Sequence, residues 1–172
     1  MEREQIAETM IAATNDVFAM MLGVDVAVGA PGYDHRGSGP NRGVVALVGL
    51  AGTWAGTGTI NCTPEQACWL ASQMLGQEFP AVNEDVLDAV GEIANMVIGN
   101  IKTSLEEALG PIGLSVPTVV YGRNFATRSV GKQSWTVVEF GCGAGSVSVG
   151  VMISQVQPSG VPRVAAPALI SV

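Results

Sequence analysis

Apolar and polar positions follow two different periods along this chain. Helical spacing of apolar residues covers 2–22 and ends at Gly23, and further helical patterns cover 64–75 and 84–109. Alternation of apolar with small or polar residues predicts strands at 24–30, 44–50, 55–62, 113–121, 134–140 and 146–153. This order predicts an α+β domain, in which a largely antiparallel sheet packs with two long helices and one shorter helix.

Local signals mark the ends of the predicted helices. Thr63 before Pro64 is typical of an N-cap followed by a first-turn proline. Asn83 is placed to cap the helix over 84–109, which Gly110 ends. A helix of that length would extend for about 39 Å, more than twice the mean length in globular proteins.

Two glycine-rich segments separate the predicted strands. Residues 31–40, which include the single histidine, His35, are expected to form a loop. Residues 141–145 invite comparison with a phosphate-binding loop, but such loops precede a helix, whereas 146–153 alternate as a strand does. We therefore predict a tight hairpin turn at 141–145.

Length and composition indicate a single globular domain. The chain has 172 residues, enough for one core, and we expect one domain over 1–154 followed by a proline-containing apolar tail over 155–172. Hydrophobic residues make up 48% and charged residues 13%, against a globular average of about 25% charged. Two long charge-free stretches, 43–64 and 140–162, contain scattered polar and small residues and are interpreted as buried sheet, not membrane spans.

The excess of acidic residues argues against two kinds of binding partner, nucleic acids and membrane surfaces. There are 15 acidic against 8 basic residues, a net charge of −7, with no two basic residues adjacent. A nucleic-acid or polybasic membrane-surface protein needs clustered Lys and Arg, so neither is expected. The N-terminal residues lack the pattern of a signal peptide, and a cytoplasmic protein is expected. Cys62, Cys68 and Cys142 form no CxxC pair, so we predict reduced thiols and no metal site.

The predicted helix over 84–109 carries one polar stripe. At about 100° per residue, its members fall within roughly 80° of each other around the helix: Asp88, Glu92, Asn95, Gly99, Lys102 and Glu106. A solvated face of an amphipathic helix would show the same pattern. Three details favour a site instead: glycines at 91 and 99 in the helix interior, an asparagine with no capping position, and crowded acids without a nearby base.

Glu92 and Asn95 are the candidate chemical groups on this stripe. They lie one turn apart and project to the same side. An amide holds a water or oxyanion but transfers no proton, and a carboxylate accepts a proton or pairs with a cation. With no Ser–His, Cys–His or metal set beside them, the pair suits a reaction centre that arrives on another molecule, where the amide orients a water for attack on a phosphoryl group.

These residues resemble the chemotaxis phosphatases of the CheC/CheX/FliY family, in particular the CheX branch. The likeness rests on residues 91–103, on residues 113–122, and on the spacing of Asp88, Glu92 and Asn95, with Pro117 about one residue early. It implies a CheC-like fold, a homodimer, and a substrate that is the phospho-aspartyl form of a CheY-like response regulator. In that family Glu92 would pair with the regulator's lysine and Asn95 would position the water.

The resemblance further implies that the chain needs no cofactor of its own, because the magnesium would belong to the regulator. A second Glu-x-x-Asn expected of CheC is missing from the first helix, where Ile11 follows Glu8 at that spacing. Asp88, Gly99 and Lys102 are candidate partner contacts, although Asp88 also suits a helix N-terminus and Lys102 also suits pairing with Glu106.

Two other functions also fit the sequence. The same acidic face suits a non-catalytic module that docks a response regulator as a scaffold. A structural dimer subunit that uses the apolar tail as its contact arm is the third alternative.

Overall fold

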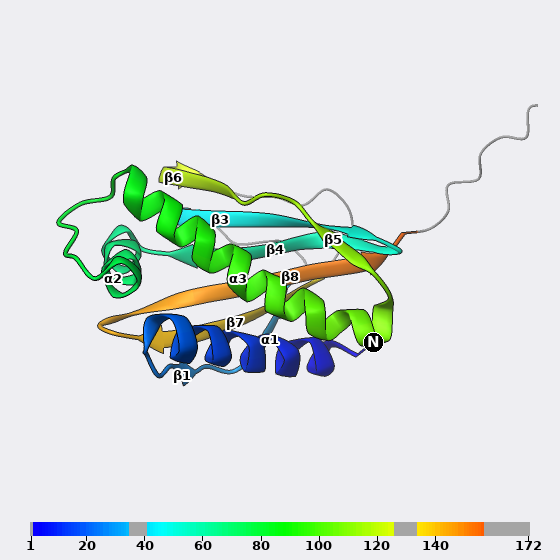
Figure 1. Cartoon of the computed structure of the whole chain (residues 1–172). Coiled ribbons are helices and arrows are strands. Elements are labelled where there is room, and N and C mark those ends of the chain that lie inside the picture. Colours follow the sequence, from blue (N-terminus) through cyan, green and yellow to red (C-terminus); the bar gives the residue numbers. More distant parts are fainter. Residues whose placement is uncertain (1, 35–40, 126–133, 157–172) are drawn as a thin grey trace, which may run out of the picture.

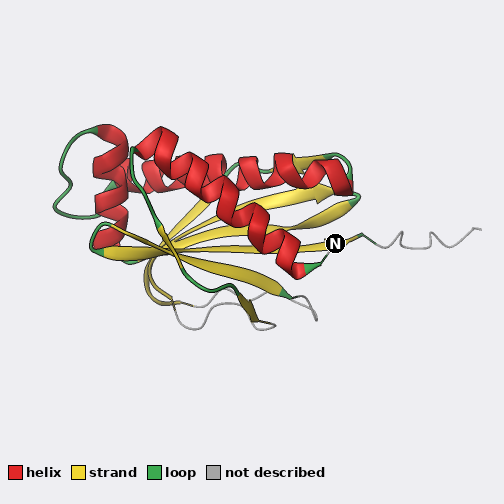
Figure 2. Ribbon diagram, turned by 90° about the horizontal axis from the view of Figure 1, so that it is seen from below, coloured by secondary structure: helices red, strands yellow, loops and turns green. Residues whose placement is uncertain are grey.

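The computed structural model describes residues 2–34, 41–125 and 134–156. An eight-stranded sheet forms one layer, and three helices form a second layer on one of its faces (Figure 2). The predicted α+β class with a largely antiparallel sheet is thereby confirmed. Within the described ranges, no helix is long and apolar enough to cross a membrane.

The helices form where the periodic patterns predict them. Helix α1 spans Arg3–Val17 and continues as a π-helical segment, η1, over Phe18–Leu22. Helices α2 (Pro64–Leu75) and α3 (Glu84–Leu109) begin at hydrogen-bonded caps, where Thr63 Oγ1 accepts from the Gln66 N–H at 3.2 Å and Asn83 Oδ1 accepts from the Val86 N–H at 3.0 Å.

All strand pairings in the sheet are antiparallel. Its strand order is β1-β7-β8-β4-β3-β5, with β2 also pairing with β7 and β6 also pairing with β3 (Figure 1). The bounds are β1 Ala27–Val28, β2 Gly32–Asp34, β3 Asn41–Gly52, β4 Trp54–Cys62, β5 Ile112–Leu114, β6 Thr118–Phe125, β7 Trp135–Cys142 and β8 Gly145–Gln155.

The glycine-rich run at 141–145 is a hairpin turn, as predicted. Strands β7 and β8 pair Cys142 with Gly145, and Gly143 adopts a left-handed φ of 60° that suits a residue without a side chain. The nucleotide-loop alternative is therefore excluded by the strand that follows. Residues 157–172, most of the predicted tail, lie outside the described residues, so the domain boundary stays a prediction.

Two strand predictions and one loop prediction were wrong in part. The strand predicted over 24–30 shrinks to β1, because only two of its residues pair with β7. Part of the predicted loop over 31–40 is strand β2, which also pairs with β7; the rest of that loop, with His35, lies outside the described residues. The single strand predicted over 113–121 is divided into β5 and β6, with Pro117, which has no N–H for a ladder bond, in the gap.

Helix α3 packs across the sheet through one fully buried side. Ile98 lies directly over Gly58 of β4, where a Cβ would come within 2.5 Å of Ile98 Cδ1. Burying a side chain of this size contributes roughly 1.5–3 kcal/mol, so such contacts fix the position of α3. The buried residues of α3 are Val86, Ala89, Val90, Gly91, Ile93, Ala94, Val97, Ile98, Ile101, Leu105 and Leu109. The opposite side of α3 faces away from the sheet.

Candidate active site on helix α3

The structure brings the predicted site residues together on the outer side of α3. Asp88 and Glu92 are exposed, and Asn95, Gly99 and Lys102 are half-buried. This arrangement follows from the helical period, since most of the residues between them are held in the core. The stripe that the sequence predicts is therefore present as a continuous surface.

The Glu92 carboxylate and the Asn95 amide are both available to another molecule. In the described part of the chain, neither side chain makes a hydrogen bond or an ion pair. One helical turn of about 4.5 Å along the axis separates the two residues. A helix whose inner side is packed in the core thus presents an acceptor carboxylate and an amide on its outer side, without an internal partner for either.

The acids at the start of α3 add negative charge beside this pair. Glu84, Asp85 and Asp88 are exposed, and no ion pair offsets them among the described residues. Acids in the first turn are favoured by the helix dipole. Together with Glu92 they make the N-terminal half of the stripe strongly acidic, which favours a cationic partner group.

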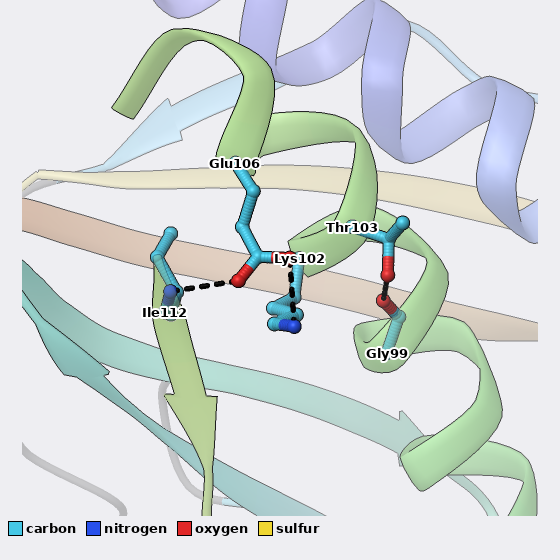
Figure 3. Close-up of polar contacts among 5 residues, drawn as sticks. All are labelled: Gly99, Lys102, Thr103, Glu106 and Ile112. Atoms are coloured by element: carbon cyan, nitrogen blue, oxygen red, sulfur yellow. Dashed lines mark hydrogen bonds and ion pairs between the residues drawn. The ribbon is translucent and has the colours of Figure 1, made fainter. Parts of the chain in front are cut away.

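Lys102 is engaged within the helix. Its Nζ lies 2.7 Å from Oε2 of Glu106, and Oε1 of Glu106 accepts a 2.8 Å hydrogen bond from the backbone N–H of Ile112 (Figure 3). The bond from Ile112, and then that from Lys102, lowers the pKa of the Glu106 carboxyl below its usual value. The pairing that the sequence offered as an alternative is thus present, and it ties the C-terminal half of α3 to β5.

The two glycines inside α3 have different surroundings. Gly91 is buried, and a Cβ there would lie 3.1 Å from Cγ2 of Val119 in β6. At Gly99 the nearest atom to such a Cβ would be Leu114 Cδ1, at an ordinary contact distance of 3.7 Å. The close approach that needs a glycine is therefore made by this chain's own strand at Gly91. Contact of a partner with Gly99 stays a prediction.

The segment 114–117 borders the stripe, which the sequence analysis missed. Leu114 lies beside Gly99, and Pro117 Cβ would lie 3.8 Å from a Cβ at Gly91. The segment therefore runs antiparallel to α3 past the turns that carry Glu92 and Asn95. Pro117 was the signal that could have located it, since a proline argues against one continuous strand.

The cysteine thiols offer no nucleophile to this face. Burial raises the pKa of Cys62 to about 12, with the neighbouring Cys142 and Cys68 adding to the rise, and burial also raises the pKa values of Cys68 and Cys142. A thiol that stays protonated at neutral pH is a poor nucleophile. Across residues 2–34, 41–125 and 134–156, no three His, Cys, Asp or Glu side chains are grouped as a metal site.

A cavity of about 790 Å³ lies at the start of α2, away from the predicted pair. The beginning of α2, the connection between α2 and α3, and the end of β6 line it. Its lining includes the polar side chains of Thr63, Glu65, Tyr121 and Arg123, and none of the predicted site residues takes part.

Comparison with known proteins places these features in a family. Residues 44–140 match the family described as "Chemotaxis phosphatase CheX". They include α2, α3, strands β4 to β6 and most of β3 and β7. A curated relative, the "CheY-P phosphatase CheX" of Thermotoga maritima, is 27% identical over 128 residues, which cover 74% of this chain and 82% of the relative.

Solved structures show the same fold. A CheC-like superfamily protein from Shewanella sp. PV-4 superimposes with a TM-score of 0.77 at 21% identity, covering 87% of this chain and 97% of that one. The CheX–CheY–BeF3–Mg²⁺ complex from Borrelia burgdorferi gives a TM-score of 0.75 at 25% identity, covering 86% and 97%. The CheC-like fold expected from the resemblance is confirmed.

Proposed function

The chain belongs to the chemotaxis phosphatase CheX family, and from this premise we propose that it hydrolyses the aspartyl phosphate of a CheY-like response regulator in chemotaxis signalling. The observation that carries the proposal is the unpaired Glu92 and Asn95 on the outer side of α3. The Borrelia neighbour, solved as a complex with CheY, supports the choice of partner.

The proposed reaction takes place on the regulator's phosphorylated aspartate. A water attacks phosphorus, and the bond between phosphorus and the aspartyl oxygen breaks. The regulator's aspartate is restored as a free carboxylate, and the phosphate leaves as dihydrogen phosphate with both hydrogens of the water. Asn95 holds the water in line through its side-chain amide, which orients without exchanging a proton. Positioning of this kind accounts for much of the rate in phosphoryl transfer.

Glu92 has a separate function in this proposal. Its exposed carboxylate pairs with the regulator's lysine and thereby aligns the two proteins. The neighbouring acids at the start of α3 attract the same positive charge before contact, so association should slow as salt is added. The magnesium ion is held by the regulator, and no residue of this chain is proposed as its ligand.

Asp88, Gly99 and Lys102 are proposed as partner contacts. Asp88 is exposed on the acidic half of the stripe, and Gly99 offers no side chain to obstruct a partner. Lys102 is held in an ion pair with Glu106, which would have to rearrange before the lysine contacts a partner. Of the three, Asp88 therefore needs the least rearrangement.

The test measures phosphate release from a CheY-type receiver domain phosphorylated with acetyl phosphate and Mg²⁺. We expect Asn95→Ala to lower kcat with little change in KM, and Glu92→Ala chiefly to raise KM. Glu107→Ala, another exposed acid of α3, is the matched control and should leave both constants unchanged. Unaltered rates in both site variants would refute the proposal. Binding without turnover in the parent protein would favour the scaffold alternative.

A homodimer and a cytoplasmic location complete the proposal. The homodimer is what the resemblance to the CheX branch implies, and a response-regulator substrate requires access to the cytoplasm. Sedimentation measures the mass of the protein in solution and so tests whether it is a dimer. The same measurement on a chain that lacks the residues after Gln155 tests whether the tail is needed for that dimer.

A further inference from the structure

Val116 is a large apolar side chain held outside the core. It is 83% exposed, and it follows the short strand β5, whose last residue, Leu114, is 38% exposed. Single exposed apolar residues are common on protein surfaces and need no explanation. Val116 differs from such residues in two ways: hydrogen bonds of Ser115 hold its backbone, and it lies near Asn95.

Three hydrogen bonds of Ser115 fix the backbone next to Val116. The Ser115 N–H donates to the Gly49 carbonyl at 2.9 Å, and the Gly49 N–H donates back to Ser115 Oγ at 2.8 Å. The Ser115 hydroxyl in turn donates to the Val116 carbonyl at 2.9 Å. These bonds anchor the segment to β3, so the backbone holds Val116 outward.

The position of Val116 relative to Asn95 follows from the contacts of its neighbour. Pro117 would touch a Cβ at Gly91 at 3.8 Å, and Gly91 lies one turn before Asn95. With standard backbone and helix spacings, the path from Val116 Cα to Asn95 Cβ is at most about 15 Å. Figure 1 shows the chain passing from β5 to β6 along the side of α3.

A protein that delivers an aspartyl phosphate to Asn95 extends this far when its interface has the standard size and is centred near Asn95. A specific interface of standard size buries about 800 Å² on each partner, equal to a disc of about 16 Å radius. A disc centred on Asn95 therefore includes Val116. Apolar groups near the centre of an interface contribute more binding energy than charged groups at the rim.

We propose that Val116, presented by the Ser115 anchor, is an apolar docking contact for the phosphorylated receiver domain. This inference rests on the proposed function and adds a determinant of affinity outside α3. In the complex, Val116 leaves water against an apolar part of the receiver surface beside its active site. Glu92 and Asn95 then supply alignment and chemistry, and Val116 supplies binding energy.

The test compares Val116→Ser with Met20→Ser. Met20 is also 83% exposed, but it lies in η1, which follows α1. Helix α1 packs mainly on α3 and β7, whereas the segment before β6 carries Val116. We expect Val116→Ser to raise KM, and Kd for the receiver, roughly tenfold, or about 1.4 kcal/mol, with kcat at saturation unchanged. Met20→Ser should change neither constant, and Val116→Ile should retain the parent affinity.

The outcomes separate this inference from the proposed function. If the parent protein releases phosphate and Val116→Ser leaves KM and Kd unaltered, the docking contact is overturned and the proposed function stands. If the parent binds the receiver without turnover, the Kd comparison still decides the inference. If Val116→Ser loses self-association while its Kd for the receiver is unchanged, Val116 belongs to a contact between copies of the chain, and the docking contact is overturned. Failure of the parent to bind any receiver overturns both.

Discussion

The two glycines inside α3 allow one substitution to be compared at two sites. Glycine in a helix interior costs about 1 kcal/mol relative to alanine, so alanine should stabilise α3 wherever its Cβ fits. At Gly99 the new Cβ would meet only Leu114 Cδ1, at 3.7 Å. We therefore expect Gly99→Ala to raise the free energy of unfolding by about 1 kcal/mol, which corresponds to a rise in Tm of roughly 2–4 °C for a protein of this size.

The same change at Gly91 should be less favourable. There the Cβ would lie 3.1 Å from Val119 Cγ2, which must retreat by several tenths of an ångström against β6. Crowding in a packed core typically costs 1–3 kcal/mol, enough to cancel the helix term or reverse it. Gly91→Ala should therefore be at best neutral, and less stable than Gly99→Ala.

Urea unfolding of both variants and the parent measures this difference. The denaturant slope should stay constant, so that the midpoints report stability alone. Destabilisation by Gly99→Ala would refute the placement of Leu114 at ordinary contact distance. Equal gains at both positions would refute the close approach of β6 to α3. Phosphate release by Gly99→Ala, measured in parallel, tests whether a partner also contacts this position.

Two further predictions concern how α3 is held. Gly58→Ala should lower the free energy of unfolding by roughly 1–3 kcal/mol, and Ile98→Ala should lower it by roughly 2–5 kcal/mol. The double variant should lose at least 1 kcal/mol less than the sum of the two losses. The reason is that Ile98→Ala removes the carbons that a Cβ at residue 58 would strike. Additive urea-unfolding energies would contradict this contact. The lowered pKa of Glu106 means that its stabilisation is present above its unfolded pKa and is lost as the pH falls through the folded value. Glu106→Gln should therefore lose less stability than the parent between pH 7 and pH 3, with Glu107→Gln as the control, and an identical pH dependence would contradict the bonds to Ile112 and Lys102.

The helices and the polar stripe were predictable because their determinants are local. Each helical hydrogen bond joins residues four apart, so the cap at Asn83 and the apolar period through Ile101 determine α3 without reference to the rest of the chain. The same period places Glu92 and Asn95 on one side. The resemblance to the CheX family, now confirmed, depended on this local spacing as well.

Strand partners and the surroundings of the stripe required the tertiary structure. Strands obtain their hydrogen bonds from residues distant in sequence, so β2 became visible only through its pairing with β7. Pro117 marks a break in the strand predicted over 113–121, but the anchoring of that break to β3 through Ser115 and Gly49 required the tertiary structure. The sequence by itself determined the helix that carries Glu92 and Asn95. Only the long-range packing decided that Val116 would be held exposed within about 15 Å of Asn95. Its position depends on the bonds between Ser115 and Gly49 and on the approach of Pro117 to Gly91, which no local pattern encodes.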